Sequence, residues 1–201
     1  MAQVAWANCG RLWHEGAWRV LSAFVFTLGY SRRQYVEFTV RQDTETFLRC
    51  HLHAFHYFGG VPTELLYDNL KTAVLYRDRE GTVHWNPRLR DFADYYGVVP
   101  RACQPYRAQT KGKVERGIGY LRGNFLLGLD LGAHTLESLN AAVLAWLRET
   151  ADVRLHGTLH ERPQDRWPAE QTGLHPLAAR DYDTSYVSQR LVSRTAARRS
   201  G

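Results

Sequence analysis

Short apolar runs separated by turn signals predict five β-strands. These runs are rich in β-branched and aromatic residues and end at glycine, proline or polar pairs, which is typical of strands. The predicted strands cover residues 2–6, 18–28, 34–40, 61–67 and 98–103. Because consecutive strands tend to be neighbours, the first three predict an antiparallel meander.

Helical spacing of apolar residues predicts four helices between and after these strands. The first begins at an N-cap, Asp43, and stops at Gly59-Gly60. Others cover 87–96 and 136–148, and one begins at about Thr110, its expected N-cap. The order βββαβαβα predicts an α/β fold: a mixed five-stranded sheet flanked by helices, which resembles an RNase H-like nuclease core.

Length and charge narrow the class of protein. The 201 residues, 44% of them apolar, suffice for one substantial core, expected over residues 1–151. Residues 152–201 are expected to form a C-terminal extension whose last dozen residues are disordered. The net charge of +6 favours an anionic partner, first of all nucleic acid. No apolar run approaches the roughly 18 residues that span a bilayer, and no signal peptide is recognisable, so we expect an intracellular protein without a membrane partner.

The cysteines and clustered histidines do not indicate a zinc site. Cys9, Cys50 and Cys103 are isolated thiols without CxxC pairing. His51, His53 and His56 have a spacing that resembles a metal motif, but they fall on a predicted helix. At about 100° per residue their side chains diverge, so we do not expect them to converge on one ion.

Two carboxylates lie at boundaries of the predicted elements. Asp68 follows the strand at 61–67, and Glu115 stands near the start of the helix predicted from Thr110. Taken alone, Asp68 is typical of an Asx turn, and Glu115 of a surface ion pair with Lys111. Together they indicate a metal and phosphate site, because carboxylates can hold two Mg²⁺ ions that stabilise both oxygens of a phosphodiester exchange. Such a site takes three acids. The third is expected in the first strand, where Ala5 stands.

Basic residues surround both acids in the sequence. They are Lys71, Arg107, Lys111, Lys113 and Arg116. We expect them to hold the DNA backbone, a contribution that is independent of base sequence and sensitive to salt. The alternative is a solvated cationic face without a ligand.

Six ordered stretches, spread over about 160 residues, carry a resemblance to a known family. They are Ala2-Gln-Val-Ala-Trp6, Leu28-Gly-Tyr-Ser-Arg32, Phe58-Gly-Gly-Val-Pro62, Tyr67-Asp-Asn-Leu-Lys-Thr-Ala-Val74, Lys111-Gly-Lys-Val-Glu-Arg116, and His156-Gly-Thr158 with Glu161-Arg-Pro163. Together they resemble the catalytic domain of the insertion-sequence 21 type transposases, within the DDE integrase superfamily. The resemblance implies that Asp68 and Glu115 are the second and third catalytic acids and ligate Mg²⁺ or Mn²⁺.

The resemblance also implies a reaction and partners. These are metal-dependent cleavage at the 3′ ends of an element, strand transfer into target DNA, assembly as a homo-multimer on DNA, and an AAA+ ATPase helper in a bacterial cytoplasm. Members of the family carry further N-terminal and C-terminal regions, so we expect this chain to correspond to a fragment.

One departure limits the activity that the resemblance implies. Ala5 stands where the family has its first catalytic Asp, and Asn8, Glu15 and Glu37 are poor substitutes. Loss of a ligand between two cations leaves their repulsion less compensated, so we expect a severe loss of strand transfer. The alternative function is a non-catalytic transposase fragment that binds DNA or subunits. An RNA-binding domain is disfavoured because no RNP-like motif is present.

Overall fold

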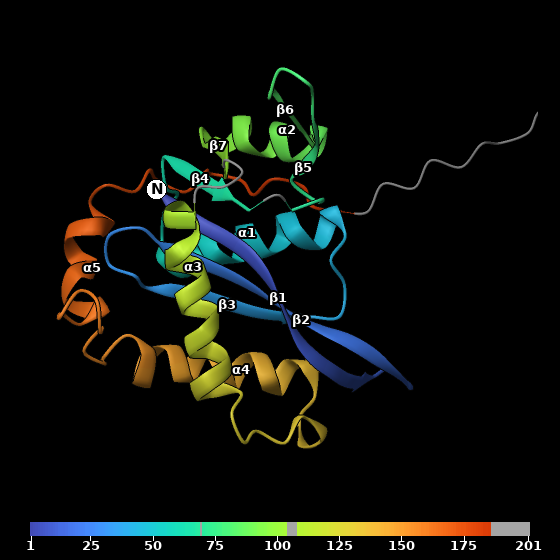
Figure 1. Cartoon of the computed structure of the whole chain (residues 1–201), viewed down its shortest axis with the longest axis vertical. Coiled ribbons are helices and arrows are strands. Elements are labelled where there is room, and N and C mark those ends of the chain that lie inside the picture. The colour runs from blue at the N-terminus through green and yellow to red at the C-terminus, as the bar shows by residue number, and fades with distance from the viewer. Residues whose placement is uncertain (69, 104–107, 186–201) are drawn as a thin grey trace, which may run out of the picture.

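A five-stranded mixed sheet with helices on both faces organises the chain (Figure 1). The computed structural model describes residues 1–68, 70–103 and 108–185, with the backbone alone at 108–111. In spatial order the strands are β3 (Gln34–Thr39), β2 (Ala17–Leu28), β1 (Ala2–His14), β4 (Glu64–Tyr67) and β7 (Val99–Ala102). β1, β2 and β3 are antiparallel neighbours, whereas β4 and β7 run parallel to β1. The predicted sheet is confirmed.

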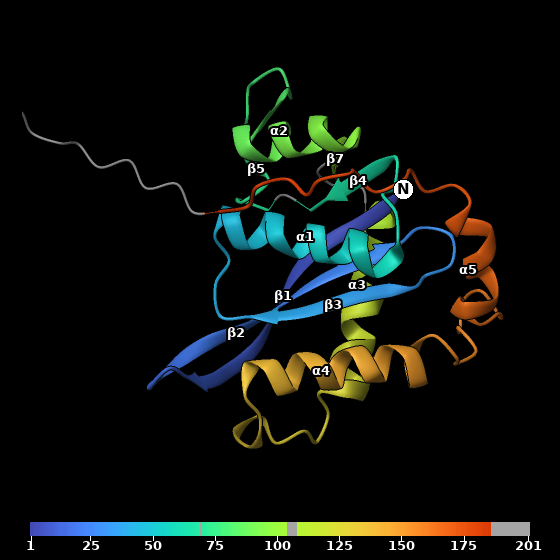
Figure 2. The same cartoon turned by 180° about the vertical axis from the view of Figure 1, so that it is seen from behind.

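Both faces of the sheet are buried, because side chains along the central strands alternate between two apolar clusters. In β2, Phe24 and Phe26 pack on one face, whereas Ala23 and Val25 pack on the other. The helices that cover these faces are α1 (Thr44–Phe58) and α2 (Pro87–Tyr96) on the first, and α3 (Ala108–Tyr120) and α4 (Leu136–Trp146) on the second (Figures 1 and 2). Burial on two faces explains why these strands read as continuous apolar runs.

Helix α1 has both of its predicted caps, and α4 has a clear N-terminal cap. The Asp43 carboxylate accepts a hydrogen bond from the Thr46 amide at 2.9 Å and so begins α1. Gly59 ends α1 with a φ of 65°, a left-handed conformation that glycine adopts without steric cost. Thr135 and Ser138 form a reciprocal capping box at the start of α4.

The predicted start of α3 is wrong by two residues. The helix begins at Ala108, so Thr110 lies inside it and is not its N-cap. Ala108 and Gln109 both favour helix, which explains the earlier start. The predicted apolar stripe is confirmed: Val114 and Leu121 are buried, and a π-helical turn at Leu121–Phe125 continues the helix.

Several elements were not predicted. β1 continues to His14, with a register shift between Asn8 and Arg11, and forms a long hairpin with β2. The remaining elements are the hairpin of β5 (Val74–Arg77) and β6 (Val83–Trp85), a 3₁₀ turn at Leu131–Ala133, a π turn at Leu147–Ala151 and α5 (Pro163–Gln171). Among the described residues, no helix combines the length and apolar character needed to cross a membrane.

The described part of the C-terminal extension packs back onto the core. The Glu170 carboxylate in α5 accepts hydrogen bonds from the amides of Tyr30 and Ser31 at 3.0 and 2.7 Å. Farther along, His175 pairs with Val61 as an isolated β-bridge. The extension therefore braces the turn between β2 and β3. The predicted disorder of the last dozen residues falls outside the described residues.

The three clustered histidines point to different partners. His53 contacts Glu37 at 2.9 Å and His56 contacts Asp181 at 2.8 Å, both near the surface. His51 is fully buried among aromatic rings, with Nδ1 2.7 Å from the Phe47 carbonyl and Nε2 3.1 Å from the Tyr67 hydroxyl. Since a carbonyl only accepts, Nδ1 carries the proton and Nε2 accepts from Tyr67. Burial lowers the pKa of His51 to about 4, so the ring stays neutral at pH 7.

Stability is expected to fall as the pH drops from about 6.5 towards 4, because the unfolded chain then binds a proton that folded His51 rejects. The shift corresponds to roughly 3 kcal/mol at the lower end of this window. His51→Asn, whose amide can still donate to Phe47, should flatten the pH dependence of the unfolding free energy in urea. His160→Asn, at an exposed position with φ 55°, is the control and should leave the slope unchanged. An equal slope in His51→Asn and the parent would contradict this assignment.

Candidate active site

The parallel pairing of β1 with β4 brings the first two predicted acid positions together. Gln3 is opposite Leu66 and Val4 opposite Tyr67, so the same register, continued by one residue, sets Ala5 beside Asp68. Paired residues of neighbouring strands share a face, so Ala5 and Asp68 belong to the face on which Gln3 lies. The sequence analysis predicted this proximity from the order of the elements, which resembles an RNase H-like core with acids at the element boundaries.

A buried hydrogen bond ties α3 to the same part of β1. The Gln3 side-chain oxygen accepts from the Val114 amide at 3.1 Å, and both residues are almost completely buried. Val114 packs in the apolar cluster that also contains Ala5. Glu115 follows Val114 and is exposed. The role of Gln3 was not predicted, because a glutamine in a strand has no distinctive sequence pattern.

Helix geometry sets the side of α3 on which Glu115 lies. Successive residues are about 100° apart, so Gly117 lies about 60° to one side of Val114 and Glu115 about 100° to the other. Gly117 faces Gln34 of β3. Because β4 lies on the opposite side of β1 from β2 and β3, Glu115 is on the β4 side of the helix. The three positions Ala5, Asp68 and Glu115 therefore converge on one region of the sheet.

The donor set in this region is one carboxylate short of the expected three. Among the described residues, no three His, Cys, Asp or Glu side chains gather as a metal-binding group. Asp68 and Glu115 offer the oxygen ligands that Mg²⁺ prefers, but Ala5 offers none. Nor does Glu37 substitute, because it accepts from Tyr35 and His53. The residues present do not fit a three-carboxylate site.

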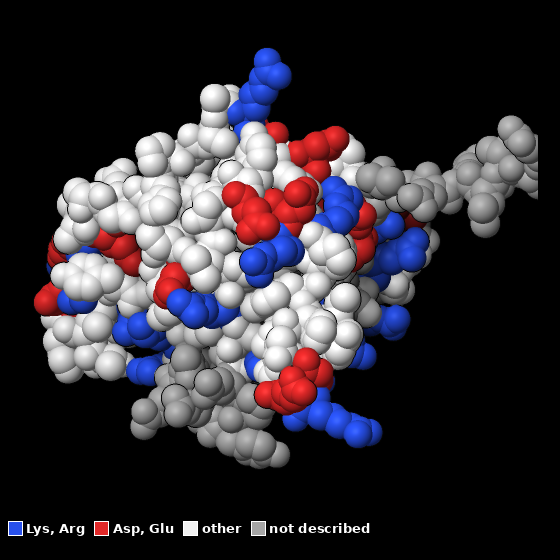
Figure 3. Space-filling model, turned by 90° about the horizontal axis from the view of Figure 1, so that it is seen from above, with Lys and Arg blue, Asp and Glu red and all other residues white. Residues whose placement is uncertain are grey.

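The predicted basic residues do not all stand beside these acids. Lys113 donates to the Gly29 carbonyl at 3.2 Å, and Arg116 to the Thr158 hydroxyl at 3.1 Å, both away from β4. Lys71 is exposed in the turn after Asp68. Arg107 and the side chain of Lys111 lie outside the described residues. On the face seen in Figure 3, Lys and Arg side chains are interspersed with Asp and Glu and do not form one continuous basic surface.

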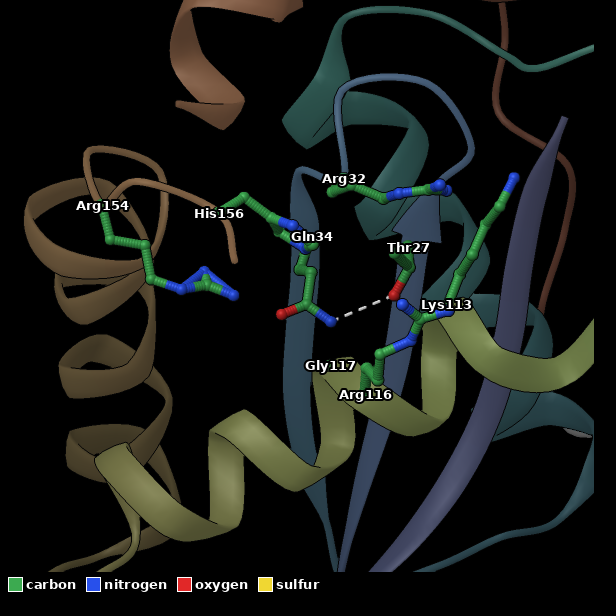
Figure 4. Close-up of a pocket in the computed structure, with 8 residues that line it drawn as sticks. All are labelled: Thr27, Arg32, Gln34, Lys113, Arg116, Gly117, Arg154 and His156. Carbon is green, nitrogen blue, oxygen red and sulfur yellow. Dashed lines mark hydrogen bonds between the residues drawn. The ribbon is translucent and has the colours of Figure 1, made fainter. Parts of the chain in front are cut away.

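Lys113 and Arg116 instead line a pocket between α3, the β2–β3 region and the segment after α4 (Figure 4). Its lining residues are Thr27, Arg32, Gln34, Lys113, Arg116, Gly117, Arg154 and His156. Burial, with a further contribution from Arg32, lowers the pKa of Lys113. Burial, followed by Arg154 and other cations, also lowers the pKa of His156. The pocket was not predicted, since its cations come from distant parts of the sequence.

Comparison with known proteins shows the family. The integrase core domain family matches residues 7–108, a stretch that contains Asp68 but neither Ala5 nor Glu115. The chain is 46% identical over 190 residues to the protein assigned as the transposase for insertion sequence element IS5376 of Geobacillus stearothermophilus, covering 94% of this chain and 46% of that protein. It is 41% identical over 172 residues to the transposase for insertion sequence element IS21 of Pseudomonas aeruginosa, covering 84% and 43%. The chain belongs to the integrase core domain family, and the relatives that it matches over most of its length are transposases of the IS21 type.

The fold of this transposase core is that of retroviral integrase cores. The HTLV-2 integrase catalytic core domain, solved in complex with magnesium in a trimeric form, superposes with a TM-score of 0.55 at 15% identity. The alignment covers 82% of this chain and 93% of that one. The RNase H-like fold predicted from the element order is confirmed. The chain spans about half the length of the curated relatives it matches.

The close approach of α3 to β3 is expected to tolerate no side chain at Gly117. A Cβ there would overlap the Gln34 amide, which is buried and donates to Thr27 at 3.0 Å. Gly117→Ala should lower the unfolding free energy in urea by about 1–3 kcal/mol. Gly119→Ala, two residues along the same helix with open space around it, is the matched control and should raise the value by up to about 1 kcal/mol. A Gly117→Ala protein as stable as Gly119→Ala would contradict the described contact.

Proposed function

We propose that this chain is the DNA-processing core of an IS21-type transposase, with its reaction centre where β1, β4 and α3 meet. The pairing of β1 with β4 and the hydrogen bond between Gln3 and Val114 support the proposal, because they bring the segments that carry Ala5, Asp68 and Glu115 to one region of the sheet. DNA is the substrate, consistent with the family and with the net charge of +6. The reaction of such a centre with all three acids present is cleavage at the 3′ ends of the element followed by strand transfer.

Asp68 and Glu115 are the metal ligands in this proposal. A bound Mg²⁺ or Mn²⁺ pair would supply charge stabilisation at the attacking and leaving oxygens of the phosphodiester. The magnesium complex of the HTLV-2 integrase core, which shares this fold, supports the choice of metal. With Ala5 in place of an acid, the ligand set is incomplete, and the chain as written has little or no strand-transfer activity.

The partners follow from the same family. Transposon ends and target DNA are the substrates, and a homo-multimer assembled on DNA is the working form. The trimeric HTLV-2 core supports a multimer. An AAA+ ATPase helper and a location in the bacterial cytoplasm, at the nucleoid when DNA is bound, complete the proposal. Since the chain spans about half of its relatives, the full reaction requires regions beyond it.

A second candidate is a non-catalytic module that binds DNA or other subunits. Ala5 favours it, because a binding role does not need the missing carboxylate. The two candidates differ in what happens when that carboxylate is supplied.

Ala5→Asp is expected to restore metal binding and to raise Mg²⁺- or Mn²⁺-dependent strand transfer by more than about 100-fold. Loss of a residue that merely orients a metal ligand already lowers metal affinity or activity by about 10–100-fold, and Ala5 replaces a ligand itself. Metal binding is measured by calorimetry with Mn²⁺. Activity is measured as strand transfer of labelled element ends, with the remaining transposase regions and the ATPase helper present.

Ala5→Asn is the matched control, because an amide of the same shape carries no charge and should restore little. Asp68→Asn or Glu115→Gln in the Ala5→Asp background should abolish the gain. If Ala5→Asp and the parent are equally active, Ala5 is not the position of the first acid. If Ala5→Asp binds Mn²⁺ no better and stays inactive while DNA is bound, the non-catalytic module is the better description.

A further inference from the structure

The cationic pocket beside α3 gathers five basic side chains from three parts of the chain. Arg32 comes from the turn between β2 and β3, Lys113 and Arg116 from α3, and Arg154 and His156 from the segment after α4. Figure 4 shows these side chains arranged around one space, above a floor of Thr27, Gln34 and Gly117. Cations gathered so closely repel one another unless an anion lies between them.

Within the described residues, no carboxylate forms an ion pair with Arg32, Lys113 or Arg116, although Glu170 lies close enough to attract Arg32 and Lys113. The hydrogen-bond partners of Arg32, Lys113 and Arg116 are neutral oxygens of Gly29, Gly112 and Thr158. The carboxylates on the adjacent extension are engaged with other groups: Glu170 accepts from the amides of Tyr30 and Ser31, and Glu161 pairs with Arg166 at 2.8 Å. The positive charge of the pocket therefore lacks a directly paired carboxylate in this part of the chain.

The two arginines at the ends of the pocket are held in place. The guanidinium of Arg32 donates to the Gly29 carbonyl, and its backbone has a φ of 66°, a left-handed conformation that costs a non-glycine residue of the order of 1 kcal/mol. The guanidinium of Arg154 lies 3.6 Å from the centroid of the Tyr120 ring, which fixes its plane. Donors that are pre-positioned in this way lose little freedom when a ligand binds.

We propose that this pocket binds one backbone phosphate of DNA, with Arg32, Arg154 and His156 as contacts beyond those predicted around the acids. Guanidinium groups match phosphate oxygens in a two-pronged geometry. This assignment rests on the proposed DNA-processing function. The pocket and Glu115 lie on opposite flanks of α3, about 10 Å apart, which corresponds to a few nucleotides along one strand.

The test compares DNA binding by two double variants with the same change in charge. Arg32→Asn with Arg154→Gln removes the pocket contacts, and Asn is chosen because it accepts the left-handed backbone at position 32. Arg11→Gln with Arg79→Gln removes two exposed cations outside the pocket. The measurement is affinity for a short element-end duplex over a series of salt concentrations, without metal, using the whole chain.

The pocket variant should bind DNA at least about 10-fold more weakly. The negative slope of log K against log salt should become less steep by about one. The control variant should change affinity by less than about 2-fold. Inorganic phosphate, used as a probe without DNA, should raise the melting temperature of the parent and of the control but not of the pocket variant. Equal weakening in both double variants, or an unchanged phosphate effect in the pocket variant, would overturn the assignment.

Further outcomes separate this assignment from the proposed function. If the Asn/Gln pair does not fold, Arg32→Lys with Arg154→Lys keeps the charge and removes the planar fork, and it should still weaken DNA binding measurably. If Ala5→Asp restores strand transfer and binding is unaffected by either pocket variant, only the pocket assignment fails. If the parent binds no DNA but is stabilised by an acidic peptide from another copy of the chain, the pocket binds a carboxylate. The pocket assignment and the proposed DNA-binding function then both fail.

Discussion

The parallel pairing of β1 with β4 is the constraint on which the candidate active site depends. Its register sets Ala5 beside Asp68. A slip of one residue would turn Asp68 to the opposite face of the sheet, since the side-chain period of a strand is two. Burial of both sheet faces prevents such a slip, because Leu65 and Tyr67 would leave a cavity in the cluster they now fill and would overpack the opposite face. The packing of the core therefore also determines the geometry of the candidate active site.

The position of α3 adds a second constraint of a different kind. Gln3 accepts from the Val114 amide inside the protein, where an unpaired donor would cost about 1–3 kcal/mol. Gly117 lets the helix lie close to Gln34. The hydrogen bond from Val114 and the close packing at Gly117 thus hold α3 in place, although its glycines give it a low intrinsic helical propensity. Without this anchoring, the position of Glu115 relative to the sheet would be poorly defined.

The predictable features were those that depend on neighbouring residues in the sequence. Asp43 and Gly59 bound α1 as predicted, because caps are local. The start of α3 was misplaced because Thr110 is a good cap residue in a stretch that is already helical. The cationic pocket escaped prediction because Arg32 and Arg154 meet only through tertiary packing. Proximity of the three acid positions was predicted from the resemblance of the element order to a known fold, whereas the strand register itself has no local pattern in the sequence.

α3 carries Glu115 on one flank and Lys113 and Arg116 on the other. Because a helix turns as a rigid unit, any rotation about its axis that displaces the two cations relative to Arg32 displaces the carboxylate through the same angle. The side chains on the two flanks therefore rotate together. A ligand seated against one flank limits the orientations open to the other, so the helix mechanically links the pocket to the proposed metal ligand.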